Sequence, residues 1–325
     1  MKNLLFFVLL SVTIAISSCQ STSQPATNES TKEETNEKTN HITQQITEHI
    51  TQHITEHYQL YLPVEKPKAV LILFGGYPQY ADDVIREFEP LSMVEDHPIA
   101  LVILNYNQRL WLEEEDKRAV AKMLQNLVEE YELPAQNLYM GGYSSGGNMS
   151  LLVGNYIVGM KEFYIDPKGI FFVDSPIELS ALYASSLKNI ARDFSVPSVQ
   201  ESTWIIETLG NRFGPPTENI EKYEAYSIYT LSTDNTQNLN KLKDVKLRFY
   251  TEPDTAWWKE NRMADPDQMN AYYIERLAKS LQKKGYQHVE YIPTENKGYR
   301  ANGDRHPHSW SIVYKEDLVD WILEE

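Results

Sequence analysis

The sequence predicts an α/β fold, in which helices flank a mainly parallel central sheet and a helical lid is inserted into it. From residue 58 to the C-terminus, short runs that are apolar at nearly every position alternate with segments of helical spacing. Strands that are buried on both faces belong to parallel sheets covered by helices on both sides. Between residues 177 and 243 the alternation stops, and helical patches follow one another without a clear strand. We expect this interval to form the lid over the ligand end of the sheet.

The predicted strands are short apolar runs that end in glycine, proline or polar residues. The first lies near residues 58–62, and the others cover residues 68–76, 99–107, 137–140, 168–176, 244–254 and 286–293. The helices between them carry apolar residues three and four positions apart, as at Val120, Leu124 and Leu127. They cover residues 81–93, 116–131, 145–160, 267–284 and 311–323. Ligands of such folds bind outside the carboxyl ends of the strands, so we look for chemistry in the loops that follow them.

Length and charge narrow the class of function. The chain has 325 residues, of which 42% are hydrophobic, enough for one large domain with a sizeable core. Its 46 acidic and 30 basic residues give a formal net charge of −16. Non-specific nucleic-acid binding needs a basic face, so no nucleic-acid partner is expected.

The N-terminus is typical of a secreted and lipid-anchored protein. Lys2 precedes an apolar run, Leu4–Ile16, which is too short for an ordinary membrane span but suits a signal peptide. Residues 16–19, Ile-Ser-Ser-Cys, resemble a bacterial lipobox, and Cys19 is the single cysteine of the chain. We therefore predict a lipoprotein signal peptide over residues 1–18. The protein would be anchored to a membrane through lipidated Cys19, on the periplasmic or cell-surface side.

Residues 19–57 are predicted to be a disordered, low-complexity tether between the lipid and a folded domain of residues 58–325. Residues 20–40 contain almost no apolar side chain, so they cannot bury enough surface to order themselves. The segment that follows repeats Ile and His every four residues, with histidines at His41, His49, His53 and His57. On a helix such histidines could bind a metal. Because threonine recurs there and weakens a helix, we favour a spacer and expect no metal site.

The stretch Gly142-Tyr143-Ser144-Ser145-Gly146 matches the pattern G-x-S-x-G. It follows a predicted strand and opens a predicted helix, which is the context in which a strained turn presents a serine as a nucleophile. Ser144 is the central residue and hence the candidate nucleophile. The two glycines are expected because the turn brings neighbouring backbones too close for side chains.

A serine nucleophile needs a histidine base and a carboxylate that orients the base. The chain order expected for a serine at such a strand-to-helix turn is serine, acid, histidine. Asp254 stands at the end of the predicted strand 244–254, after LRFYTEP, and is the preferred acid, with Asp174 and Glu252 as alternatives. For Asp174 the competing interpretation is that it caps a helix. His306 and His308 both lie in the loop before the last helix, and Pro307 between them makes it improbable that both point inward.

An oxyanion hole needs two backbone N–H donors. The stretch Phe-Gly-Gly-Tyr at residues 74–77 follows an early strand, and its glycines would let the backbone approach a substrate. We expect one donor to be the N–H of Gly76 or Tyr77 and the other to be the N–H of Ser145.

From about residue 58 onward the chain resembles an α/β-hydrolase-fold serine esterase, through the pieces FGGY, GYSSG, EPD and HSW. The resemblance implies an eight-stranded sheet and a triad of Ser144, His308 and Asp254. It favours His308 over His306 because this family tends to have an aromatic residue two positions after the histidine, here Trp310. It also implies cleavage of a small or glycan-borne ester through an acyl-enzyme, without a metal or other cofactor. An exopeptidase of the same fold and a non-catalytic binding lipoprotein remain as alternatives.

Overall fold

The computed structural model describes residues 43–46, 50–106 and 109–324. Backbone contacts divide the chain into a unit of residues 1–39 and a unit of residues 40–325. The first unit lies outside the described residues, and so do the predicted signal peptide and Cys19. The second unit contains the whole described fold. Within it, every helix is too short or too polar to cross a membrane.

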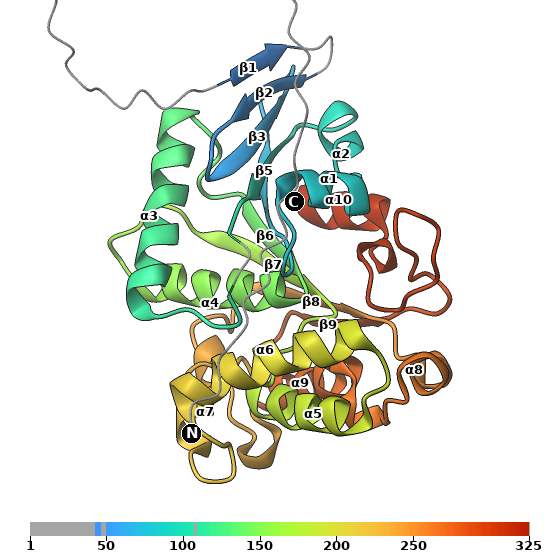
Figure 1. The fold of residues 1–325 in the computed structure, drawn as a ribbon. Coiled ribbons are helices and arrows are strands. Elements are labelled where there is room, and N and C mark those ends of the chain that lie inside the picture. The colour runs from blue at the N-terminus through green and yellow to red at the C-terminus, as the bar shows by residue number, and fades with distance from the viewer. Residues whose placement is uncertain (1–42, 47–49, 107–108, 325) are drawn as a thin grey trace, which may run out of the picture. The chain divides into compact units, whose positions relative to one another are not determined.

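One sheet of nine strands forms the centre of the described unit (Figure 1). The strands lie in the order β1-β2-β3-β5-β4-β6-β7-β8-β9. They are β1 (Thr43–Ile46), β2 (Ile50–Ile54), β3 (Tyr58–Pro63), β4 (Ala69–Phe74), β5 (Ile99–Leu104), β6 (Leu138–Tyr143), β7 (Pro167–Val173), β8 (Lys246–Thr251) and β9 (Val289–Pro293). The six strands from β5 to β9 in this order are parallel, and the first three strands are antiparallel. The parallel strands therefore all end at one edge, where a ligand site is expected.

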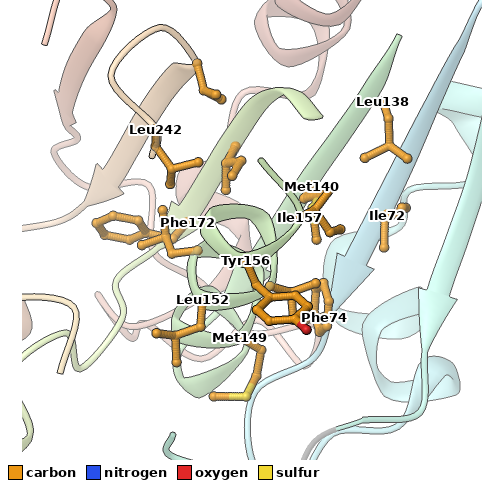
Figure 2. Packing of buried hydrophobic residues seen from close by; sticks show 14 of the residues in the cluster. Ile72, Phe74, Leu138, Met140, Met149, Leu152, Tyr156, Ile157, Phe172 and Leu242 are labelled. Carbon is orange, nitrogen blue, oxygen red and sulfur yellow. The ribbon is translucent and has the colours of Figure 1, made fainter. Parts of the chain in front are cut away.

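Helices cover both faces of the sheet, which explains the continuous apolar runs of the parallel strands. Every residue of β4, β5 and β6 is buried. One face is covered by α3 (Glu114–Glu130), α4 (Ser145–Gly159) and α9 (Asn270–Lys283), and the other by α1 (Ala81–Phe88), α2 (Ser92–Glu95) and α10 (Lys315–Leu323). Figure 2 shows the first of these two cores, in which Leu152 and Tyr156 of α4 lie beside Met140 and Phe172 of the sheet. The predicted α/β class and mainly parallel sheet are confirmed.

The antiparallel strands at the start correct the predicted tether. β1 and β2 lie within residues 19–57, and β2 pairs with β3 so that His53 is opposite Leu60. Isoleucine and threonine are β-branched and favour an extended backbone, and a neighbouring strand was available to pair with. His53 therefore lies on a strand rather than on a helix. Among the described residues, no group of three or more His, Cys, Asp or Glu side chains could hold a metal.

The interval 177–243 is helical, as predicted. It lies between β7 and β8 and contains α5 (Leu179–Arg192), α6 (Val196–Phe213), α7 (Ile220–Glu224) and two short 3₁₀ turns, η1 (Leu231–Thr233) and η2 (Gln237–Leu239). The helices pack around a small apolar cluster of Leu179, Ile205, Leu209, Phe213 and Tyr223, which also includes Leu110 from the segment before α3. In Figure 1 they lie below the sheet, next to α8 and α9. That they act as a lid stays a prediction.

The helices differ from those predicted in several places. The helix expected over 81–93 is divided, because Glu89 adopts a left-handed conformation (φ 51°) before Pro90. An unpredicted helix, α8 (Thr255–Arg262), follows β8, and the 3₁₀ turn η3 (Pro266–Gln268) comes before α9. The last helix begins at Lys315, after the 3₁₀ turn η4 (Trp310–Ile312).

Candidate active site

Ser144 lies at a strained corner between β6 and α4. Its backbone has φ 53° and ψ −129°, a conformation that residues with a Cβ rarely adopt. Such backbone strain costs roughly 1–3 kcal/mol and persists only where the surroundings impose it. Here the Ser144 N–H donates to the carbonyl oxygen of Val173 at 2.9 Å, and the Gly147 N–H donates back to the Ser144 carbonyl at 3.0 Å. The sheet and the helix thus hold the corner from both sides.

The two glycines of the motif are required by close backbone contacts, as expected. A Cβ at Gly142 would lie 2.1 Å from the carbonyl oxygen of Gly146, and a Cβ at Gly146 would lie 2.2 Å from that of Phe74. Neither contact can be relieved by turning a side chain, because the atoms that would clash belong to the backbone. The geometry of the turn therefore requires glycine at positions 142 and 146.

His308 and Asp174 meet beside this corner. His308 Nδ1 lies 2.7 Å from Asp174 Oδ2. The ring of His308 also packs on the ring of Tyr143, the residue before Ser144, at a centroid distance of 4.6 Å. Burial raises the pKa of the Tyr143 hydroxyl, which stays protonated and donates to the backbone oxygen of His308 at 2.8 Å. The ring of His308 is thereby held by Asp174 and Tyr143, and its backbone by the Tyr143 hydroxyl.

Burial and hydrogen bonds fix the position of the Asp174 carboxylate. It follows β7 directly, at φ 46°, and it is buried. Its Oδ1 accepts a hydrogen bond from the Thr251 hydroxyl at 2.5 Å, which leaves Oδ2 for the histidine. The Asn270 amide donates to the Asp174 backbone oxygen at 2.7 Å. Sequence reasoning missed Thr251 and Asn270, because only the pairing of β7 with β8 and the packing of α9 bring them to Asp174.

The choice of Asp254 as the acid is corrected by this geometry. Asp254 caps α8, where its Oδ1 accepts the N–H of Trp257 at 2.9 Å. Its Oδ2 lies 2.8 Å from a guanidinium nitrogen of Arg305. The physical reason is local: β8 ends at Thr251, and Asp254 is then engaged by the helix that starts after it. Helix capping, the role considered for Asp174, belongs to Asp254.

Glu252, the other alternative, holds the loop that carries the histidine. Its buried carboxylate accepts hydrogen bonds from the backbone N–H groups of Lys297 and Gly298, at 2.8 and 3.0 Å, and from the Thr294 hydroxyl. It also forms an ion pair with Arg305. These contacts attach the loop to the end of β8 but do not bring the Glu252 carboxylate to His308.

His306 supports His308 instead of replacing it. Its Nδ1 accepts the backbone N–H of His308 at 3.2 Å, and its ring packs on Trp257 at a centroid distance of 4.7 Å. Burial, together with His308 and the nearby guanidinium groups of Arg300 and Arg262, lowers the pKa of His306 to about 3. His306 is therefore a neutral hydrogen-bond acceptor near neutral pH.

The loop after β4 reaches the corner, as expected of an oxyanion loop. A Cβ on Gly76 would lie 2.8 Å from the Cβ of Ser144, so only glycine allows this approach. The Tyr77 N–H donates to the side-chain oxygen of Ser145 at 3.0 Å, and the Gly76 N–H donates to Oε1 of Gln79 at 3.2 Å. Ser145 is the first residue of α4, so its own N–H has no acceptor within the helix. Of the two candidates in the loop, Tyr77 is the one whose N–H points to the serine turn.

A cleft of about 790 Å³ opens at these residues. Ser144, Ser145, Tyr77 and His308 line its floor, and the helical insert supplies much of its wall. Tyr77 stacks on Trp204 of α6 with a centroid distance of 4.5 Å and an interplanar angle of 9°. The insert thus contacts the loop next to the serine.

Comparison with solved structures identifies the architecture. An S-formylglutathione hydrolase from Agrobacterium tumefaciens superposes with a TM-score of 0.52 at 12% identity, over 86% of this chain and 98% of that one. A fluorophosphonate-binding serine hydrolase of Staphylococcus aureus gives 0.51 at 12% identity, over 87% and 98%. The fold is that of the α/β-hydrolases. An acylaminoacyl peptidase from Pyrococcus horikoshii also matches, with a TM-score of 0.50 at 16% identity, over 87% of this chain and 41% of its own. No protein-family model matches the sequence, and no curated protein matches it significantly.

The insert of this α/β-hydrolase fold turns polar stripes toward the cleft. The cleft-lining positions recur three and four apart along each helix, so each set forms one face. On α5 they are Leu182, Ser185, Ser186 and Asn189, and on α6 they are Pro197, Ser198, Glu201, Ser202, Trp204 and Ile205. Six of these ten side chains are polar. On these two helices the cleft therefore presents hydroxyl, amide and carboxylate groups beside the apolar side chains of Leu182, Trp204 and Ile205.

Proposed function

We propose that this protein is a serine hydrolase that cleaves carboxylic esters with Ser144 as nucleophile, His308 as base and Asp174 as the orienting acid. The observation that carries the proposal is the strained Ser144 in one cleft with a histidine whose other ring nitrogen lies 2.7 Å from a buried carboxylate. A simple small-residue turn would need neither the strain nor the histidine–aspartate pair.

The proposed reaction follows from these positions. Ser144 Oγ attacks the ester carbonyl and gives its proton to Nε2 of His308. Asp174 keeps the Nδ1–H tautomer of His308 and stabilises the imidazolium that forms. The alcohol leaves with that proton, and water then releases the acid from Ser144 by the same groups in reverse.

The N–H groups of Ser145 and Tyr77 would stabilise the oxyanion. Ser145 opens α4, where the helix dipole favours negative charge. Each such donor contributes about 3–4 kcal/mol to the lowering of the barrier. Because the Tyr77 N–H is engaged by the Ser145 hydroxyl, we propose that this hydroxyl moves aside when substrate binds.

The substrate class is proposed from the polar wall of the cleft. A short acyl group on a polar alcohol, such as a glycan-borne ester, fits the polar stripes of α5 and α6 better than a long fatty acyl chain. A peptidase reaction is the second candidate, since one neighbour of the fold is an acylaminoacyl peptidase. It uses the same triad on an amide.

The first test is labelling with a fluorophosphonate probe, which reacts only with an activated serine. The protein from residue 43 onward is compared with Ser144→Ala and His308→Ala. We expect labelling that is lost in both variants, followed by hydrolysis of acetyl esters faster than of acyl-peptide amides. A folded wild-type protein that does not label would contradict the hydrolase proposal and favour the non-catalytic binding role.

We also propose that the protein is a lipoprotein, anchored through Cys19 at the periplasmic or cell-surface side of a bacterial membrane. The support is the sequence Ile-Ser-Ser-Cys after an apolar signal segment. Growth with an alkyne-tagged fatty acid should label the full-length protein and leave Cys19→Ser unlabelled. Equal labelling of the two proteins would overturn this proposal.

A further inference from the structure

Two arginines line the cleft next to the proposed base. Arg262 is the last residue of α8, and Arg300 lies in the loop that carries His308. The guanidinium of Arg300 lies 5.8 Å from the centre of the Tyr143 ring, and that ring packs on His308. A nitrogen of Arg262 lies 3.5 Å from Nε2 of His306. Two different elements thus bring positive charge to the same end of the cleft.

Within the described residues, neither arginine forms an ion pair with a carboxylate. Arg262 donates to the backbone oxygen of Asn261 and lies over the ring of Trp257. Arg300 makes its side-chain contact with Tyr143. By contrast, Arg305 in the same loop is paired with two carboxylates. A guanidinium has five N–H donors in a planar fork, so both cleft arginines keep donors for a ligand.

The convergence of the two charges also shows at His306. Arg300 and Arg262 both contribute to the lowered pKa of this histidine, after its burial and the effect of His308. His306 is consequently neutral and adds no charge of its own. Its lowered pKa shows that the positive charges of Arg262 and Arg300 both act on the same residue of the cleft.

The acidic groups of the cleft do not cancel this pair. Asp83 and Glu87 line the cleft, but Arg86 bridges them, at 2.8 and 3.4 Å. Glu87 also accepts the N–H of Ala301. Glu201, on α6, is the remaining carboxylate of the lining. Since the whole chain has a formal charge of −16, two unpaired cations at the reactive end are a local exception that would attract an anion.

We propose that Arg262 and Arg300 form a subsite for an anionic group of the substrate, a carboxylate or a phosphate, next to Ser144 and His308. This inference rests on the proposed ester hydrolysis and specifies its substrate class: a short ester whose alcohol part carries the negative charge. Arginine suits this role because its fork matches the oxygens of both groups. The polar wall of α5 and α6 would then contact the rest of a small polar substrate.

The test uses three acetyl esters of similar size: O-acetylglycerol, which is neutral, O-acetylglycerate and O-acetylglycerol phosphate. We expect kcat/KM to be higher for at least one anionic ester than for the neutral one. A hydrogen-bonded charge pair contributes enough to expect a change of about tenfold for each arginine. In Arg262→Gln/Arg300→Gln the ratio of anionic to neutral kcat/KM should fall towards one. The two anionic esters distinguish a carboxylate site from a phosphate site.

Arg118→Gln is the matched control, because Arg118 is an exposed cation of α3 paired with Glu162, outside the lining of the cleft. It removes one guanidinium outside the cleft, where the double variant removes two inside it, and should keep the anionic-to-neutral ratio of the wild type. An unchanged ratio in the double variant, with normal fluorophosphonate labelling, would overturn the subsite and leave the proposed hydrolase intact.

Direct binding separates the two proposals. Glycerate and glycerol phosphate are titrated calorimetrically into the full-length protein at low salt, with glycerol as the neutral reference. We expect binding of an anion by the wild type and by Ser144→Ala, weakened at least about tenfold in the double arginine variant. Equal binding by the wild type and the double arginine variant, or no binding by either, would contradict the subsite whether or not the protein hydrolyses esters.

Discussion

Asp174 Oδ2 lies 2.7 Å from His308 Nδ1, although 134 residues separate the two in the chain. The aspartate follows β7, the strand next to β6, and β6 ends one residue before Ser144. The histidine comes from the loop after β9, which Glu252 and Arg305 attach to the end of β8. The parallel sheet thus brings three loops to one edge, and this contact is the reason for proposing Asp174 as the acid.

Asp174→Asn should abolish most activity, whereas Asp254→Asn should not. An amide at position 174 would favour the wrong histidine tautomer, and in a comparable triad such a change lowers kcat about 10⁴-fold. Asp254 caps α8, so Asp254→Asn should cost at most ~1 kcal/mol of stability and leave kcat within about threefold. Initial rates with an acetyl ester check both variants, and melting curves confirm that each is folded. Equal losses in the two variants would contradict the assignment of Asp174.

His306 should make the protein less stable in acid. Its pKa of about 3 in the folded state lies below the usual 6.5. Between these values the unfolded chain binds a proton here and the folded chain does not, so stability falls as the pH drops from 6.5 towards 3. His306→Asn keeps an acceptor for the His308 N–H but cannot titrate. Its melting temperature should fall less steeply over this range than that of the wild type, and parallel curves would argue against a neutral His306.

Ser144→Gly should be more stable than Ser144→Ala. Both variants lack the hydroxyl, but glycine adopts φ 53° and ψ −129° without strain, whereas alanine keeps the Cβ. The expected difference in unfolding free energy is about 1 kcal/mol in favour of glycine. Urea denaturation of the two inactive variants measures it. If alanine proved equally stable, the corner would store no strain.

Gly76→Ala should slow the reaction without unfolding the protein. The added methyl would lie 2.8 Å from the Cβ of Ser144 and 2.9 Å from the carbonyl oxygen of Tyr143, so the loop must move away from the serine. Loss of an oxyanion donor by this shift should lower kcat roughly 100-fold. Gly210→Ala on α6 is the control, because its methyl would meet only ordinary contacts at 3.6 Å or more. Similar rates for the two variants would exclude the loop from catalysis.

The turn at Ser144 was predictable because its geometry depends on five consecutive residues. Gly142, Ser144 and Gly146 indicate the turn without reference to any residue distant in the chain. The carboxylate that contacts His308 was not predictable, because Asp174 and Asp254 both follow apolar strands and the sequence does not say which one a helix will use as its cap. The first strands were missed for a related reason, since the Ile–Thr repeat becomes β2 only where β3 can pair with it.

The same limit applies to the cleft arginines. Arg262 lies in a helix that the strand-and-helix pattern did not predict, and Arg300 lies in a loop of polar residues. Nothing in the spacing of these two residues relates them to His306. Their proximity arises from the way α8 and the histidine loop pack at the end of the sheet.

The cleft should favour short acyl groups, and a single substitution should weaken that preference. Burying each CH₂ against an apolar wall is worth about 0.8 kcal/mol, but the stripes of α5 and α6 offer mostly polar side chains. We therefore expect kcat/KM for 4-nitrophenyl acetate to equal or exceed that for the octanoate. Ser198→Leu would add an apolar surface on the cleft face of α6 and should raise the octanoate-to-acetate ratio several-fold. Gln200→Leu, on the same helix but outside the lining, should leave the ratio as it is. A wild type that prefers octanoate would contradict the polar substrate class, since the chain would then bind the apolar side chains of the cleft in preference to its polar stripes.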